Sequence, residues 1–248
     1  APFSAKCAVT RTNARLGGSL FVVGDLSADS GDRRRLAFDG RTLDVAGDAN
    51  MGAGCKLNGK LDLSGAGIGK NLDLREAEIS GGEGLSLAHA RVAGSLLLEG
   101  ANIKGETMLQ GARIEGDLRF AGGRFINAAH WAISAAKAAV RGDVSFRITD
   151  GPAPHGRKTV IEGGADLQAM RIGGALIWEN LALRGPGPDG ASALLRIADA
   201  VIEGSLCARS VEAQADARID ASGASCCALE DDVEHGWGQN GSPPILDG

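Results

Sequence analysis

Four side chains that could bind or act on a ligand lie together between residues 147 and 158 of this 248-residue chain: Arg147, Asp150, His155 and Arg157. Guanidinium and imidazole groups bind anions, and imidazole and carboxylate groups transfer protons near neutral pH. The segment also carries the Gly-Pro punctuation of a loop. Because loops on rigid scaffolds often carry function, we predict a binding surface here. The alternative is a solvated insertion.

Aspartates recur at outward positions and offer a second kind of chemistry. Pairs of carboxylates on one face are the groups with which glycoside hydrolases cleave polysaccharides. Alternating polar residues on a solvated strand face explain such acids equally well. The residues concerned are Asp62, Asp73, Asp117, Asp143 and Asp166.

Other catalytic or metal-binding motifs are missing from the sequence. The five cysteines have no metal-ligand spacing, and no dinucleotide fingerprint or nucleophile elbow occurs. A polar cluster near the carboxyl end, Asp231, Asp232, His235 and Trp237, is interpreted as part of a cap. We therefore expect no catalytic residue, no metal and no cofactor. Cys207 and Cys226 are expected to act as small apolar residues.

An 11-residue phrase determines how these side chains are positioned. Three consecutive copies read ARVAGSLLL (90–98), ANIKGETML (101–109) and ARIEGDLRF (112–120). Apolar residues at every second position around a central glycine are typical of short strands rather than of a helix. Such strands cannot bury their apolar edges alone, so the phrases must stack as a solenoid.

Further copies begin at Ala14, Leu43, Cys55, Ala66, Ala138, Thr159, Met170 and Ala200. The sequence therefore predicts an all-β fold, a single parallel β-helix that we expect to be right-handed. Two phrases make a coil of about 22 residues with four short sides, and roughly six or seven coils follow. We expect Leu96, Ile103, Ile114, Leu118 and Phe120 to point inward. Arg113, Glu115, Asp117 and Arg119 should point outward, and the central glycines should turn corners, where they tolerate positive φ or a tight corner that a β-branched residue would resist.

One domain is predicted over residues 1–248. Residues 1–13 are a lead-in or cap, residues 14–220 form the coils, and residues 221–248 form the carboxyl-terminal cap. Loops are expected near 25–40, 126–137, 147–158 and 184–192. The alanine-rich stretch 127–140 has helical propensity. It also copies the phrase from Ala138 onward, so we favour a coil there, preceded by a short helix.

Charge limits the partners. The chain has 26 Lys and Arg against 31 Asp and Glu, a formal net charge of −5. This argues against nucleic acid as a partner. No apolar run is long enough to span a membrane. We expect a cytoplasmic protein or one peripheral to a membrane, which binds a protein partner or itself.

The units ANIKG (101–105) and ARIEG (112–116) resemble the repeats of bacterial β-solenoid proteins of pentapeptide-repeat-like type. Paired units span 11 residues here rather than 10. The chain also resembles poorly characterised bacterial solenoid proteins, some of them labelled membrane-associated oxidoreductases. In those proteins similar units end in a Leu-Asp-Gly segment, matched here by Leu246, Asp247 and Gly248. The resemblance implies that membrane association would come through a segment absent from this chain.

Three function classes follow. A non-catalytic structural or protein-interaction scaffold, acting within a larger or membrane-associated assembly, is favoured because the repeats specify coil geometry and no convergent site. A carbohydrate-active β-helix enzyme is the second. A mimic of duplex DNA that binds a topoisomerase is the third, and the mixed charges of Arg91, Lys104, Arg113 and Arg119 speak against it.

Overall fold

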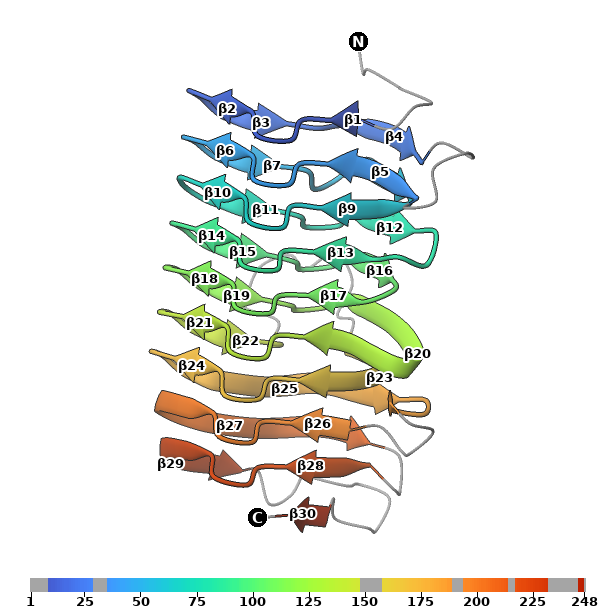
Figure 1. The fold of residues 1–248 in the computed structure, drawn as a ribbon. Helices are drawn as coiled ribbons and strands as arrows, with labels where there is room; N and C mark the ends of the chain where they lie inside the picture. The colour runs from blue at the N-terminus through green and yellow to red at the C-terminus, as the bar shows by residue number, and fades with distance from the viewer. Residues whose placement is uncertain are drawn as a thin grey trace.

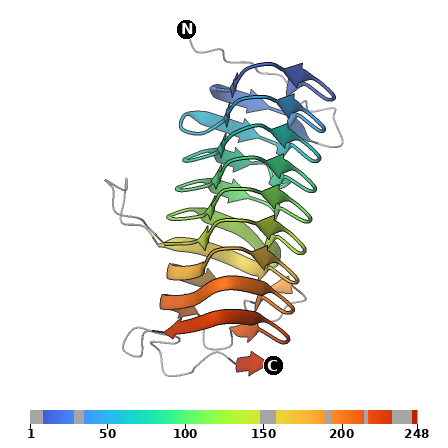
Figure 2. The same cartoon turned by 90° about the vertical axis from the view of Figure 1, so that its left-hand side faces the viewer.

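The computed structural model describes residues 9–28, 35–147, 158–188, 194–213, 217–231 and 245–247. Its 30 strands belong to one sheet, the strand pairings are parallel, and the described residues contain no helix. The chain winds around a rod, with its two ends at opposite ends of the rod (Figures 1 and 2). The predicted single parallel β-helix is thus confirmed.

Each coil has four sides, and strands of the same side pair from coil to coil. The first side contains β2 (Arg15–Leu16), β6 (Asp44–Val45), β10 (Gly67–Ile68), β14 (Arg91–Val92), β18 (Arg113–Ile114), β21 (Ala139–Val140), β24 (Arg171–Ile172) and the beginnings of β27 (Val201–Ala213) and β29 (Ser225–Asp231). The second side contains β3 (Leu20–Phe21), β7 (Ala49–Asn50), β11 (Leu72–Asp73), β15 (Leu96–Leu97), β19 (Leu118–Arg119), β22 (Val144–Ser145), the beginning of β25 (Leu176–Arg184) and later parts of β27 and β29.

The other two sides complete the coil. The third contains β4 (Gly24–Ser27), β8 (Cys55–Asn58), β12 (Glu78–Ser80), β16 (Asn102–Lys104), the beginnings of β20 (Arg124–Ser134) and β23 (Thr159–Asp166), and the ends of β25 and β27. The fourth contains β1 (Val9–Thr10), β5 (Leu36–Asp39), β9 (Lys60–Asp62), β13 (Leu85–Ser86), β17 (Thr107–Met108), the ends of β20 and β23, β26 (Leu194–Arg196), β28 (Arg218–Asp220) and β30 (Ile245–Asp247).

The core runs along the axis of the rod. All five residues predicted to point inward, Leu96, Ile103, Ile114, Leu118 and Phe120, are at most 2% exposed. Burying a side chain of this size stabilises the fold by about 1.5–3 kcal/mol, so every coil contributes to its neighbours' stability. Aromatic rings continue the stack: Phe120 lies parallel to Phe146, with 4.7 Å between ring centroids. Of the residues predicted to point outward, Arg113 and Glu115 are exposed, and Asp117 and Arg119 are half-buried.

More coils are present than the phrase count predicted. Nine successive strand positions line the first side within the described ranges. At about 4.8 Å per coil the stack is about 40 Å long. The prediction of six or seven coils was wrong because half-coils such as Arg124–Ser134 (β20), which insertions interrupt, do not match the phrase and were not counted.

Insertions leave the rod at the two ends of the third side, and the corners beside the first side stay tight (Figure 1). The loop predicted at 25–40 is shorter than expected, because β4 and β5 occupy its two ends. The helix expected before Ala138 is wrong. Residues 124–134 form β20, whose two ends pair with neighbouring coils, while Ala138 begins a coil as predicted.

Glycines at the corner between the first and second sides make room for a polar ladder. We use this name for Ser19, Asp48, Asn71, Ser95, Asp117 and Asp143. Each of these side chains accepts a hydrogen bond from the backbone N–H of its counterpart in the next coil, with N···O distances of 2.8–3.2 Å. In the six bonds, the last of which is donated by Ala175, donor and acceptor are 29, 23, 24, 22, 26 and 32 residues apart. The ladder therefore keeps its register while the insertions vary.

These glycines serve a tight corner, one of the two roles predicted for them. A Cβ at Gly116 would lie 2.5 Å from Ser95 Oγ, and one at Gly174 would collide with Asp143 Oδ1. Neither residue has positive φ, so the close approach of a neighbouring coil excludes a side chain. The prediction of positive φ holds instead at the corner between the third and fourth sides, where φ is +141° at Gly59 and +111° at Gly105.

Candidate functional site

The residues predicted to form a binding loop lie mostly outside the described ranges. Asp150, His155 and Arg157 fall within residues 148–157, so this prediction stays untested. Arg147 is described and exposed, and its Nε lies 3.5 Å from Glu179 Oε2. The prediction of a carboxyl-terminal polar cluster also stays untested. Of its members, Asp231, Asp232, His235 and Trp237, only the backbone of Asp231 is described.

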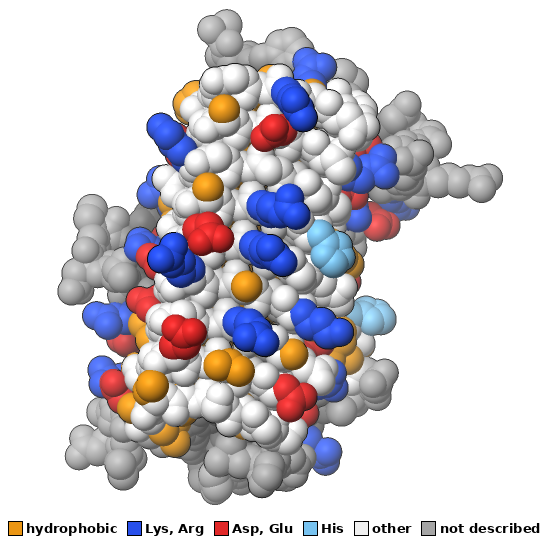
Figure 3. Space-filling view, turned by 60° about the vertical axis from the view of Figure 1, so that its left-hand side comes forward, with side chains coloured by type: hydrophobic (Ala, Val, Ile, Leu, Met, Phe, Trp, Pro, Cys, Tyr) orange, Lys and Arg blue, Asp and Glu red, His pale blue; other side chains and the backbone are white. Residues whose placement is uncertain are grey.

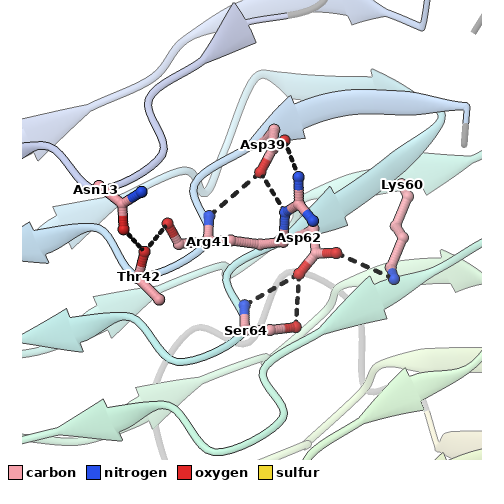
Figure 4. A network of polar contacts seen from close by, with 7 residues as sticks. All are labelled: Asn13, Asp39, Arg41, Thr42, Lys60, Asp62 and Ser64. Atoms are coloured by element: carbon pink, nitrogen blue, oxygen red, sulfur yellow. Dashed lines mark hydrogen bonds and ion pairs between the residues drawn. The ribbon is translucent and has the colours of Figure 1, made fainter.

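Most of the regularly spaced aspartates hold turns. Asp62 Oδ1 accepts hydrogen bonds from Ser64 N (3.0 Å) and Ser64 Oγ (2.6 Å), and Lys60 Nζ lies 3.2 Å from its second oxygen (Figure 4). The same bond to the backbone N–H two residues later recurs at Asp39, Asp73, Asp166 and Asp220. Such Asx turns stabilise the corner that follows a strand. These acids therefore have a structural role that accounts for their spacing.

Two of the turn-forming aspartates are buried rather than solvated. Asp39 is 5% and Asp62 7% exposed, and the two are paired in register on β5 and β9. Each is compensated on its own coil: Arg41 binds both oxygens of Asp39 at 2.9 and 2.8 Å, and Lys60 pairs with Asp62. Asp62 stands between the inward residues Leu61 and Leu63, as its outward position in the phrase requires, but it is buried rather than solvated.

A denser charge cluster lies after the second side. Burial alone would raise the pKa of Asp73, but hydrogen bonds from Arg75, at 3.0 and 2.6 Å from its side chain, outweigh burial and lower it. In the next coil burial raises the pKa of Glu99, against the opposing effect of Arg119 and Arg75. Asp73 is thus paired with Arg75, whereas Glu99 Oε2 is buried without a hydrogen-bond partner among the described residues.

The tryptophans and cysteines add no site of their own. Trp178 is fully buried, and Arg196 lies over the ring of Trp131 at 4.9 Å from its centroid, so that face of the ring is covered. The four described cysteines are free thiols, and burial raises the pKa of Cys55 to about 11. Cys207 is half-buried, but Cys226 is exposed, so the expectation of a small core residue there was wrong.

Arginines gather on the first side, whose outward surface from Arg91 to Arg171 we call the arginine face. Arg91, Arg113, Ala139 and Arg171 occupy one register position in four successive coils. The three arginines are exposed. Beside them, at the next outward position, stand Glu115, Arg141 and Gly173. Figure 3 shows basic side chains following one another down this surface.

Arg41, Arg75 and Arg147 each form an ion pair with a carboxylate, whereas the guanidinium groups of this row form none within the described ranges. Among the described residues, no carboxylate lies within 4.0 Å of Arg91, Arg113 or Arg171. Arg141 alone has a contact, 3.8 Å from Glu115, and both side chains are mostly solvated. Like charges on neighbouring strands are destabilising. No ion pair among the described residues offsets this repulsion, which makes the row a candidate binding surface.

A hollow of about 530 Å³ interrupts the row. It lies over Ala139 and Gly173, whose small side chains replace the longer ones at the same position in adjacent coils, and Arg113, Arg141 and Arg171 surround it. Glu115 and Glu203 complete its rim. The volume falls within the range of small-ligand sites.

Sequence reasoning missed this surface although a signal was present. Arg91 and Arg113 both occupy the second position of a phrase, as does Arg171 in MRIGGALIW (170–178). The insertions between Phe120 and Met170 hide the register that places Arg171 on the same row. Only the paired strands show that these residues share one face.

Comparisons of the chain with protein-family models, with curated proteins and with solved structures found no match. The resemblance to pentapeptide-repeat-like solenoids therefore stays a prediction. In the described part of the chain, no group of three or more His, Cys, Asp or Glu side chains is arranged to hold a metal ion. Within the same ranges, the structure contains no helix with the length and apolarity that a membrane crossing requires.

Proposed function

We propose that the protein is a non-catalytic interaction scaffold whose arginine face binds an acidic surface of a partner protein. The observation that supports this is the row formed by Arg91, Arg113 and Arg171, which are exposed and have no carboxylate within 4.0 Å among the described residues. Arginine is enriched in the centres of protein interfaces because its planar guanidinium forms two hydrogen bonds with one carboxylate. The parallel sheet already orders the backbone of the row, so binding has to order only the arginine side chains.

The surrounding charges favour a protein over nucleic acid. Glu115 and Glu203 stand beside the row, and the chain as a whole is acidic at −5. A continuous phosphate backbone laid along the face would approach these glutamates, whereas a protein surface carries separate carboxylates that can meet single arginines. Carbohydrate cleavage receives no comparable support, because turn formation already accounts for Asp62 and Asp73.

The test is binding of acidic peptides with matched charge reversals. We expect fluorescence anisotropy to show binding of Asp/Glu-rich peptides that weakens with salt, and loss of about tenfold or more in affinity for Arg91→Glu/Arg113→Glu. Arg124→Glu is the matched control, since Arg124 is an exposed arginine at the same phrase position on the third side. Equal weakening by the control, or no binding of any acidic peptide, would contradict the proposed function.

A further inference from the structure

We infer that the hollow between Arg113 and Arg171 is a site for a phosphoryl group carried by a side chain of the partner. This deepens the proposed function and rests on it. The row of arginines alone would bind any acidic surface. The hollow adds a defined place in that row, with a size and a donor arrangement that select one kind of anion.

The hollow exists because two outward side chains are small. Ala139 stands in register between Arg113 and Arg171, and Gly173 follows Arg171 on the next outward position. An arginine at position 139 would continue the row without a gap. Instead, the flanking arginines are two strand spacings apart, about 10 Å between their Cα atoms, with free space between them. Two long side chains can therefore approach one ligand from opposite sides.

Three guanidinium groups around one space match a phosphoryl group better than a carboxylate. A carboxylate offers two oxygens, which one arginine can bind in a bidentate manner. A phosphorylated side chain carries three acceptor oxygens and a charge between about −1.5 and −2 at neutral pH. Arg113, Arg141 and Arg171 all line the hollow and supply the donors for those oxygens.

The acidic rim does not prevent this use. Glu115 is 3.8 Å from Arg141, with relative side-chain exposures of 57% and 80%, so the pair is weak and exchangeable. A phosphoryl group of higher charge can replace that carboxylate on Arg141. Glu115 and Glu203 then disfavour further anions at the rim, so the hollow is selective for a single phosphorylated residue rather than a run of acids.

The experiment compares three versions of one peptide, with phosphoserine, serine or aspartate at the central position, by isothermal titration. We expect the phosphoserine peptide to bind about tenfold or more tightly than the aspartate peptide. Inorganic phosphate should compete with the phosphopeptide. Arg171→Ala should remove most of the difference between the two peptides, and Arg124→Ala should leave it unchanged.

Ala139→Arg separates the inference from the proposed function. It fills the hollow while adding a positive charge to the arginine face. If the hollow binds the phosphoryl group, Ala139→Arg should weaken binding of the phosphopeptide. If the arginine face attracts acidic groups in general, Ala139→Arg should strengthen binding of the aspartate peptide. If Ala139→Arg strengthens both, or if the two peptides bind equally to the wild type, the hollow is not a phosphoryl site and the proposed function stands. If neither peptide binds, both are wrong.

Discussion

The arginines of the first side and the aspartates of the fourth side are two rows of like charge in the same rod. Asp39 and Asp62 face each other in register on β5 and β9, as Arg91 and Arg113 do on β14 and β18. The aspartates are buried, form turns and have a cation on their own coil. The arginines are exposed, and among the described residues no carboxylate lies within 4.0 Å of either guanidinium group.

In a repeat protein, a row of like charges is not by itself a sign of function. Stacking identical phrases places identical residues in rows, so a row of acids or bases follows from the fold alone. Where the row contributes to the fold, each charge is compensated locally. A row left without compensation costs stability and so points to something outside the chain. Variants that disturb the register, the pairing of a charge or the row itself test that distinction.

The largest effect is expected when the register is disturbed at the corner beside the arginine face. In Gly174→Ala the new methyl group collides with Asp143 Oδ1 and lies 2.9 Å from the backbone of Gly142. The neighbouring coil must move, which should cost about 1–3 kcal/mol in the free energy of unfolding, measured by urea denaturation.

Two variants control this result. Gly18→Ala changes the equivalent corner of the first coil, where nothing lies within 4 Å of the added methyl, and should alter stability by less than about 0.5 kcal/mol. Combining Gly174→Ala with Asp143→Ala should cost less than the two single changes together, because the collision with Oδ1 is gone. Strict additivity would show that the polar ladder does not determine the need for glycine.

A smaller effect is expected from Glu99, whose compensation is incomplete. Burial raises its pKa above the ordinary value of 4.5, so the folded state favours the protonated carboxyl. The stability that this group contributes at low pH is lost as the pH rises through the folded pKa. Glu99→Gln should therefore stabilise the protein at pH 7 by a few tenths of a kcal/mol, and the gain should disappear below about pH 4.5.

Urea denaturation at several pH values measures this difference. Glu76→Gln is the control, because it removes the same charge at an exposed corner of the preceding coil. A gain for Glu99→Gln that is constant from pH 4 to pH 8 would show that the charge of Glu99 is not involved.

The sequence was sufficient for the fold because every phrase repeats the same inward residues. Ile103 and Ile114, 11 residues apart, already indicate the period, and both are buried. Burial of apolar side chains depends on local alternation, which a single sequence displays. The number of coils was less accessible, since half-coils such as β20 are interrupted by insertions and do not match the phrase.

The candidate site was not accessible from the sequence, for a different reason. Both Arg41 and Arg113 have an acidic residue two positions away, Asp39 and Glu115. The arginine row itself exists only through contacts between coils, and insertions change the sequence distance between coils from 22 to 32 residues. Arg41 and Arg113 look alike in the sequence. Only the structure shows that one binds Asp39 and that the other borders a hollow. The role of glycine at the ladder corner depends on the same contact between coils.

The smallest effect on stability is expected from the arginine face itself, and it tests the premise of both proposals. Arg113→Ala removes a charge that faces Arg91 on the neighbouring strand and loses only the partial cover of an exposed stem. The free energy of unfolding should change by less than about 0.5 kcal/mol, with a slight gain at low salt that disappears as salt screens the repulsion. Arg41→Ala, which removes two hydrogen bonds from the buried Asp39 carboxylate, should by contrast destabilise the protein under both conditions. A loss for Arg113→Ala as large as that for Arg41→Ala, independent of salt, would mean that the arginine row supports the fold. The row would then no longer be evidence for a partner.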